Sequence, residues 1–234
     1  MKVSVLSGGA AAAVVKGVEP VFNAKTGFGV EGVYSAVGQM RDQLLQGQPC
    51  DVVILTRAMI DALITSGHVL PGSARSLGRV RTGVAVRKGT PWPAIGSRAE
   101  LAQAFRAARG IYFPDAVKST AGVHFMKVLQ ALGLDAEKQP AFRQFPNGAT
   151  AMREMGESDE EGLIGCTQVT EINYTPGVEL VGMLPQEFEL ATDYTLGVCT
   201  AAANLEQARV LADLIAGPAS AAIRRQGGFE FEGA

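Results

Sequence analysis

Short apolar runs alternate with longer amphipathic segments along this chain, and the alternation limits its possible folds more than any other feature. Asp51–Leu55 is a continuous apolar run, typical of a strand buried on both faces of a parallel sheet. Ala58–Ser66 follows with helical periodicity, and Gly67 stands just past its end, where helices commonly stop. Repeated strand–helix alternation predicts a doubly wound α/β fold.

The same pattern extends from one end of the chain to the other. It predicts strands at Lys2–Leu6, Gly29–Val33, Asp51–Leu55, Arg79–Arg87, Gly110–Phe113, Phe142–Phe145, Gly162–Cys166, Val178–Val181 and Glu189–Cys199. It predicts helices at Ala11–Lys25, Val37–Gln46, Ala58–Ser66, Arg98–Ala108, Thr120–Leu132, Gly148–Met155, Leu205–Ile215 and Pro218–Gln226.

Two of the expected strands, Arg79–Arg87 and Glu189–Cys199, are long enough to leave one sheet and enter another. We therefore expect two doubly wound lobes joined by two crossing strands. Residues 1–80 together with 195–234 form the first lobe, and residues 81–194 form the second. The hinge lies near 80–87 and 192–199.

Composition excludes several classes of function. The net charge is −2 and no Lys/Arg cluster occurs, so nucleic acid is not an expected partner. No apolar run approaches the length of a membrane span, so no membrane insertion is expected. The two histidines and three cysteines form no metal-ligand spacing, and the cysteines are expected to be buried thiols. We expect no metal, no cofactor and a monomer.

The location of the protein stays open at this point. The first expected strand begins at residue 2, and no segment before it resembles a signal peptide. The protein is cytoplasmic if Met1 is the native start, and periplasmic if a leader has been removed.

The first strand runs directly into Ser7, Gly8, Gly9 and Ala10, and an alanine-rich helix follows. Small residues at a helix start leave backbone N–H groups accessible, and such a terminus attracts anions. A tight strand-to-helix turn is the alternative interpretation.

Six loops follow a strand and precede a helix in this way, namely Ser7–Ala10, Ser35–Val37, Thr56-Arg57, Lys118–Ala121, Asn147–Ala149 and Thr167-Gln168. Ligands of doubly wound sheets bind beyond the carboxyl ends of strands, so we expect these loops to line a cleft between the lobes.

Several side chains in or near these loops are candidates for ligand contact. Arg57 follows a buried strand and would clamp a carboxylate, although a surface ion pair is the commoner fate. Arg81, on a crossing strand, either reaches a ligand or faces solvent. The remaining candidates are polar or small. Ser35 and Ala36 either contact a ligand or form a helix cap, and the two roles are equally expected. Ser119 and Thr120 cap a helix, donate to a ligand or do both, and Thr167 and Gln168 would supply neutral hydrogen bonds.

His124 lies about one turn into the helix predicted over Thr120–Leu132. If it faces the cleft it is the natural general acid or base for a proton shift. A single histidine beside Phe125 is more often a hydrogen-bonded interior residue. Cys166 would act as a base only if its thiolate were stabilised.

Four motifs stand out along the chain. They are Ser7-Gly-Gly-Ala10 with Phe22 closing the first helix, Gln43-Leu-Leu-Gln-Gly-Gln-Pro-Cys-Asp51-Val-Val-Ile, Asp115 before Thr120-Ala121-Gly122, and Gln226-Gly-Gly-Phe229. Together they resemble the motifs of the type II periplasmic solute-binding proteins, in particular the molybdate-binding-protein-like group. The resemblance implies a binding protein that closes around a small anion and serves an ABC permease. A ligand sensor without a permease is a further possibility if Met1 is the native start.

The oxyanion-binding residues of that group are largely absent here. Its first serine position falls on Ala10, its second among Ala36, Val37 and Gly38, and its tyrosine near Gly165 or Cys166. Ala121, which would offer a backbone N–H, matches. Each missing hydrogen bond costs about 1–3 kcal/mol. The expected ligand is therefore an organic carboxylate rather than molybdate or tungstate.

Other runs resemble a divergent branch of this group. They are Arg81-Thr-Gly-Val-Ala-Val-Arg-Lys-Gly89, Gly122–Gly133, and Gln168-Val-Thr-Glu-Ile172 followed by Pro176–Gly182. The aconitate isomerases are similar to this branch. That likeness implies the alternative function, an isomerase that shifts a double bond in an unsaturated polycarboxylate by proton transfer, with His124 as its catalytic residue.

Overall fold

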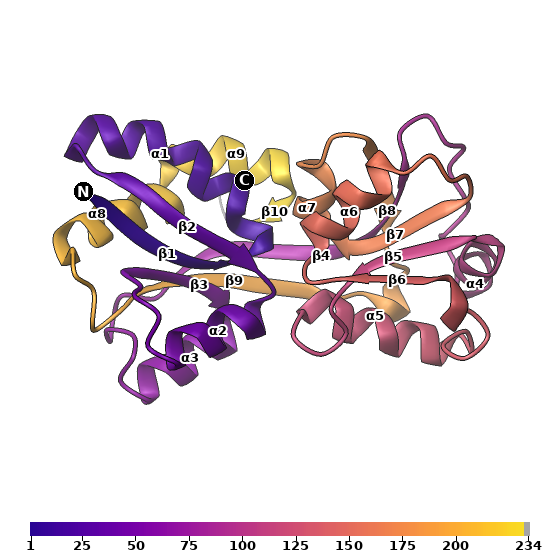
Figure 1. Cartoon of the computed structure of the whole chain (residues 1–234), viewed down its shortest axis with the longest axis horizontal. Coiled ribbons are helices and arrows are strands. Elements are labelled where there is room, and N and C mark those ends of the chain that lie inside the picture. The colour runs from indigo at the N-terminus through magenta and orange to yellow at the C-terminus, as the bar shows by residue number, and fades with distance from the viewer. Residues whose placement is uncertain (232–234) are drawn as a thin grey trace. The chain divides into compact units, whose positions relative to one another are not determined.

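The computed structural model describes residues 1–231, and the chain divides into two α/β units (Figure 1). Unit 1 comprises Met1–Val80 and the segment from Thr192 onward, and unit 2 comprises Arg81–Ala191. The chain passes between them in the long strand β4 (Arg75–Arg87) and again at the start of β9 (Ala191–Val198). The fold class is thus the predicted one, two doubly wound units joined by two crossing strands.

Unit 1 is built on a sheet with the strand order β2-β1-β3-β9, in which β1, β2 and β3 are parallel and β9 is antiparallel to β3. Helices cover both faces of this sheet, with α1, α8 and α9 on one side and α2 and α3 on the other (Figure 1). Besides β4 and β9, its elements are β1 (Lys2–Gly8), η1 (Gly9–Ala11), α1 (Ala12–Thr26), β2 (Gly29–Ser35), α2 (Val37–Leu45), β3 (Val52–Thr56), α3 (Arg57–Thr65), α8 (Leu205–Ala216), η4 (Pro218–Ser220), α9 (Ala221–Gly227) and β10 (Phe229–Glu230).

Unit 2 repeats this arrangement on the strand order β4-β7-β5-β6, and β8 also pairs with β4. Helices α6 and α7 lie on one face of the sheet, and α5 lies on the other (Figure 1). Its elements are α4 (Arg98–Ala107), β5 (Gly110–Pro114), α5 (Thr120–Ala131), η2 (Gln139–Ala141), β6 (Phe142–Phe145), α6 (Gly148–Glu157), β7 (Leu163–Gln168), α7 (Val169–Asn173), β8 (Val178–Met183) and η3 (Gln186–Phe188).

Strand β5 shows why the sheet of unit 2 needs helices on both faces. Ile111 and Phe113 point to one side, where Phe113 packs edge-on against Phe125 of α5 with ring centroids 5.3 Å apart. Tyr112 points to the other side and packs with Met152 of α6. All five residues of β5 are buried. Since side chains alternate along a strand, a continuous apolar run produces two cores.

Three predictions about local structure were wrong. Helix α7 was not predicted, because Val169–Asn173 is only five residues long and carries no helix-length pattern. The helix expected at Ala11 begins at Ala12, after a 3-10 turn at Gly9–Ala11. The helix expected at Pro218–Gln226 is a 3-10 turn followed by α9, because Ser220 Oγ donates to the carbonyls of Ile215 and Gly217. Within residues 1–231, no helix combines the length and apolar character that crossing a membrane requires.

Candidate functional site

Three strand-to-helix loops of unit 1 lie at one edge of its sheet. Strand β1 is central, and its register pairs Gly8 with Ser35 of β2 and Ser7 with Ile54 of β3. Because the three strands are parallel and end almost level, the loops that follow them are neighbours. The predicted loops Ser7–Ala10, Ser35–Val37 and Thr56-Arg57 are therefore brought together.

Two of these loops open a helix without a side-chain cap. Gly8 precedes η1 and Ala36 precedes α2, and at neither start does a capping side chain accept a hydrogen bond from the helix N–H groups. The two starts also touch. A Cβ placed on Gly8 would lie 2.7 Å from Cγ1 of Val37 and 3.1 Å from Cε1 of Tyr194. Adjacent helix N-termini combine backbone N–H donors with partial positive charge, which suits an anion.

The serines beside these helix starts use their hydroxyl protons within the protein. Ser7 is fully buried and its Oγ donates to the carbonyl of Gly8 at 2.9 Å. Ser35 Oγ donates to Oε1 of Gln39 at 2.8 Å. A hydroxyl has one proton, so these two serines leave the backbone N–H groups as the donors of the η1 and α2 starts. Gly9 is half-buried and Ala10 is buried within η1.

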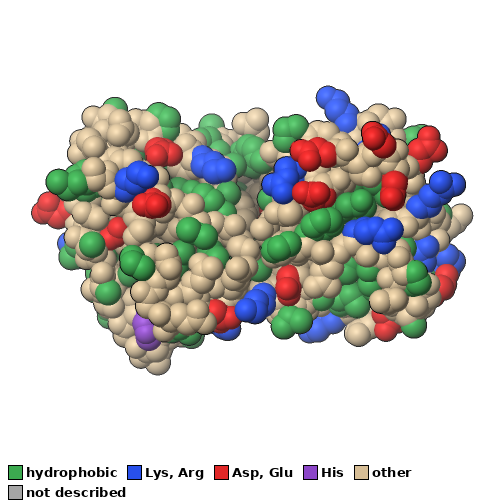
Figure 2. Space-filling view, in the orientation of Figure 1, with side chains coloured by type: hydrophobic (Ala, Val, Ile, Leu, Met, Phe, Trp, Pro, Cys, Tyr) green, Lys and Arg blue, Asp and Glu red, His purple; other side chains and the backbone are tan. Residues whose placement is uncertain are grey.

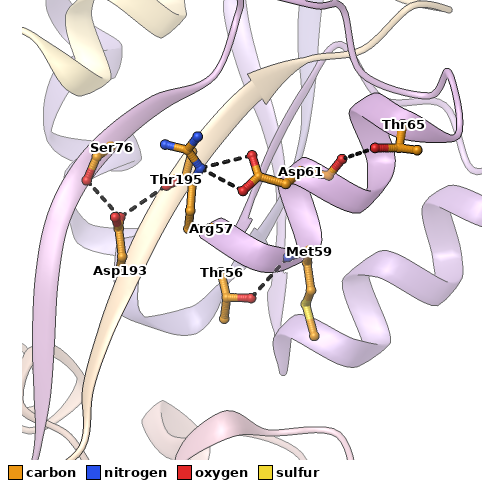
Figure 3. Close-up of polar contacts among 8 residues, drawn as sticks. All are labelled: Thr56, Arg57, Met59, Asp61, Thr65, Ser76, Asp193 and Thr195. Atoms are coloured by element: carbon orange, nitrogen blue, oxygen red, sulfur yellow. Dashed lines mark hydrogen bonds and ion pairs between the residues drawn. The ribbon is translucent and has the colours of Figure 1, made fainter.

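Arg57 begins α3, the third helix at this edge, and Thr56 caps that helix by accepting from the N–H of Met59. Figure 3 shows Nε of Arg57 donating to both carboxylate oxygens of Asp61, each at 2.9 Å. The terminal guanidinium nitrogens make no bond to the residues drawn there. The hydrogen bond and charge of Asp61, with a smaller contribution from Asp193, raise the pKa of Arg57.

Asp193 lies nearby on β9. Its Oδ1 accepts from Ser76 Oγ at 2.7 Å and from Thr195 Oγ1 at 3.0 Å (Figure 3). The acid is therefore held by two hydroxyls that come from the two long strands. Neither Asp193 nor Tyr194 was predicted from the sequence, because β9 showed only an apolar β-prone pattern.

The predicted α5 loop of unit 2 is capped from within. Ser119 Oγ accepts from the N–H of Gly122, Thr120 is half-buried as the first helical residue, and Ala121 is buried. Arg81, on β4, forms an ion pair with Glu189 at 3.0 Å, and both side chains are about one-third exposed (35% and 36%).

The start of α6 already holds an acidic group of the protein itself, the carboxyl of Glu171. Thr167 Oγ1 donates to its Oε2 at 2.6 Å, and the backbone N–H groups of Gly148, Ala149 and Gln168 also donate to it. A Cβ on Gly148 would lie 2.0 Å from that oxygen, so only glycine fits. Burial raises the pKa of Glu171 although these hydrogen bonds oppose the rise.

The structure places two further sequence candidates of unit 2 beside this carboxyl group and at the next helix start. The Thr167 hydroxyl serves Glu171, and Gln168 is buried at the start of α7. Nothing in the sequence indicated Glu171, because its partners Gly148 and Ala149 lie more than twenty residues earlier.

His124 is half-buried on α5, whereas Cys166 lies in the interior of unit 2. Nε2 of His124 lies 2.7 Å from the carbonyl of Phe188, which can only accept, so this nitrogen carries the proton. Cys166 is fully buried in β7, and burial raises the pKa of its thiol, which rules against a stabilised thiolate.

A separate open cavity of about 950 Å³ lies in unit 1 beside Ser76, Arg79, Asp193 and Arg224. Arg224 is buried and donates to Ser220 Oγ and to the carbonyls of Leu77, Ala216 and Gly217. This guanidinium is thus used to fix the chain. None of the strand-end loops lines the cavity.

Comparison with known proteins agrees with this architecture. Residues 3–230 match the model of the family described as "Bacterial extracellular solute-binding protein". A curated relative, aconitate isomerase from Pseudomonas sp., is 27% identical over 224 residues, which cover 91% of this chain and 81% of that protein.

Two solved structures illustrate the likeness in fold. The periplasmic molybdate-binding protein of Azotobacter vinelandii superposes with a TM-score of 0.79 at 18% identity, covering 98% of this chain and 99% of that one. The sulfate-binding protein SubI of Mycobacterium tuberculosis H37Rv superposes with a TM-score of 0.75 at 16% identity, and the match covers 100% of this chain and 88% of that one. Because the family model spans nearly the whole chain, this protein belongs to the bacterial extracellular solute-binding proteins.

Proposed function

We propose that this solute-binding protein takes a small organic carboxylate, held first by unit 1. The observation that carries the proposal is the pair of touching helix starts, η1 and α2, that lack capping side chains. Their backbone N–H groups bind one carboxylate group. Arg57, whose terminal nitrogens point away from Asp61 in Figure 3, binds a second one end-on.

The residues at these helix starts favour a carboxylate over a tetrahedral metal oxyanion. Ala10 and Ala36 carry no hydroxyl group, and the hydroxyl protons of Ser7 and Ser35 are already donated within the protein. A fully enclosed oxyanion would lack several hydrogen bonds, at about 1–3 kcal/mol each. A carboxylate needs fewer donors than a fully enclosed tetrahedral oxyanion.

Unit 2 supplies further candidate contacts in this proposal. They are Arg81, Ser119, Thr120, Ala121 and Gln168, with Thr167 acting only through Glu171. The membrane partner would be an ABC permease that receives the ligand. On the face that Figure 2 shows, basic and acidic side chains are interspersed over each unit. Specific contacts therefore have to select the anion, since a broad positive field is not seen on that face.

The test is a binding panel read by calorimetry, with di- and tricarboxylates, molybdate, tungstate and sulfate as ligands. At least one carboxylate should bind, and more tightly than any inorganic oxyanion. Tighter binding of molybdate or sulfate would refute the carboxylate assignment.

A matched pair of variants locates the ligand. Ala36→Asp places a carboxylate at the start of α2, and Ala36→Asn places a neutral group of equal size there. Both cap the helix. Repulsion between carboxylates should weaken binding by about tenfold or more in Ala36→Asp relative to Ala36→Asn. Equal affinity in the two variants would remove α2 from the site.

A second candidate function is supported by the 27% identical aconitate isomerase. In this alternative the protein moves a proton and a double bond in an unsaturated polycarboxylate, and His124 is the acid–base group. Turnover of cis-aconitate to the trans isomer, followed by NMR, tests it directly. His124→Ala should abolish turnover and retain binding. Absence of any trans product with the native protein would eliminate this candidate.

A further inference from the structure

Two of the three cysteines are neighbours in unit 1. Cys50 lies in the loop before β3, and Cys199 directly follows β9. The antiparallel register of these strands continues to this point, since the N–H of Cys199 donates to the carbonyl of Asp51 at 2.9 Å. This backbone bond pairs Cys199 with Asp51, the residue next to Cys50. Cys50 Sγ donates to the carbonyl of Val52 at 3.1 Å, and its sulfur is the side-chain hydrogen-bond partner of the Cys199 thiol. The backbone bond thus makes the two residues neighbours, and the contact between the thiols brings their sulfur atoms together.

The pair is reduced in this structure and lies just beneath the surface. Cys50 is 6% exposed and Cys199 is 1% exposed. The residues before Cys50, from Leu45 to Pro49, are all exposed, and so is Thr200 after Cys199. A small opening of this loop is enough to admit a reagent to Cys50.

We propose that Cys50 and Cys199 form a disulfide when the protein meets a disulfide donor, either a small molecule such as oxidised glutathione or a thiol–disulfide oxidoreductase. The thiolate of Cys50, the more exposed of the two, attacks one sulfur of the donor, whose S–S bond breaks and releases one thiol. Cys199 then loses its proton and attacks the Cys50 sulfur, releasing the second thiol. The protein loses two protons and two electrons, and the donor disulfide is reduced to two thiols.

The position of the pair gives this bond a structural consequence. Unit 1 consists of two chain segments, Met1–Val80 and the part from Thr192 onward, separated in sequence by all of unit 2. Cys50 lies in the first segment and Cys199 in the second. A cross-link would make unit 1 covalently continuous, and long closed loops gain most from such a link.

The experiment uses the native full chain, treated with oxidised glutathione and compared with the reduced protein. Intact mass should fall by two hydrogens, and peptide mapping should find one linked pair containing Cys50 and Cys199. Only Cys166 should react with a thiol reagent after unfolding. The melting temperature should rise by about 5–15 °C and return to its starting value on reduction.

Matched variants separate this pair from general thiol oxidation. Cys166→Ser should still form the cross-link, whereas Cys50→Ser and Cys199→Ser should not. The mapping on the native chain decides the question even if a variant fails to fold. Three reactive thiols after treatment, a stable glutathione adduct without closure, or a link through Cys166 would each overturn the proposal. A cross-link that leaves the melting temperature unchanged would overturn its structural consequence.

Discussion

The strand-end helix N-termini of the two units are satisfied to different degrees, although both units are built from the same strand–helix alternation. In unit 2, Ser119 and Asn147 cap α5 and α6, Glu171 adds a carboxyl group at α6, and α7 starts after Gln168 without a side-chain cap. In unit 1, Thr56 caps α3, whereas η1 and α2 start after Gly8 and Ala36 without a capping side chain. A strand-end loop is therefore not a ligand site by topology alone. Our proposal assigns the ligand to the two uncapped starts of unit 1, where backbone N–H donors are left to an external anion.

The buried carboxylates sharpen the same contrast. Glu171 serves a helix start in unit 2, whereas Asp51 of unit 1 joins strands and loops. Asp51 Oδ2 accepts from the N–H and Oγ of Ser4 at 2.8 and 2.9 Å, and its Oδ1 accepts from the N–H of Asn204 at 3.0 Å. Burial opposes ionisation of Asp51, but the hydrogen bonds from Ser4 and Asn204 prevail and lower its pKa. Burial prevails at Glu171 and raises its pKa.

Removing the buried carboxyl group of Glu171 from unit 2 should have the largest effect on stability. Glu171→Ala leaves the Thr167 hydroxyl and three backbone N–H groups buried without their acceptor. We expect a loss of about 3–5 kcal/mol in the free energy of unfolding, measured by chemical denaturation. Glu171→Gln keeps one carbonyl acceptor and should cost much less.

The pH dependence of Glu171→Gln provides a second measurement. The pKa of Glu171 in the folded protein is raised above its ordinary value of 4.5. The contribution of the Glu171 carboxyl group to the free energy of unfolding is therefore fully present below pH 4.5, and it is lost as the pH rises through the pKa of the folded protein. Stability of the native protein should therefore fall relative to Glu171→Gln as pH rises above about 4.5. Parallel stability curves for the two proteins would contradict the raised pKa.

How much of this could be predicted from the sequence differs between fold and site. The alternation of buried strands and glycine-ended helices predicted the doubly wound architecture, because periodicity is a local property of the chain. Gly8 and Ala36 were identified as loop residues for the same reason. The contact of Gly8 with Tyr194, and that of Gly148 with Glu171, depend on how distant segments pack. No local pattern encodes those contacts, so Tyr194, Asp193 and Glu171 were missed.

Asp51 should show an intermediate effect with the opposite pH dependence. Asp51→Asn puts an amide N–H₂ where a carboxylate oxygen meets buried donors, and we expect a loss of about 1–3 kcal/mol at neutral pH. A carboxyl group with a lowered pKa stabilises the fold above its ordinary value of 3.8, and this contribution is lost as pH falls through the folded value. The difference in free energy of unfolding between the native protein and Asp51→Asn should therefore become smaller in acid.

Unfolding titrations at neutral pH and near pH 4 or below test this prediction for Asp51. Asp61→Asn is a useful control, because Asp61 is half-exposed and pairs with Arg57 on the surface. The prediction would be wrong if the difference in free energy of unfolding between the native protein and Asp51→Asn became larger in acid. Burial, rather than the hydrogen bonds from Ser4 and Asn204, would then determine the ionisation of Asp51.

The smallest effect on stability is expected at Arg57, and it separates the structural from the binding role of the unit 1 edge. The Arg57–Asp61 pair is exposed, and α3 is already capped by Thr56, so Arg57→Gln should leave the unfolding midpoint unchanged. If the terminal nitrogens of its guanidinium bind a ligand carboxylate, the same variant should lower the affinity for the ligand by about tenfold, because a charge-assisted hydrogen bond is worth roughly 1.5–3 kcal/mol.

Asp61→Asn is the control variant. It frees Nε of Arg57 and keeps the positive charge, so the affinity for the ligand should be retained or increased. Unchanged affinity in Arg57→Gln would show that the helix starts of η1 and α2 act without an arginine, and the ligand would then need only one carboxylate on this unit.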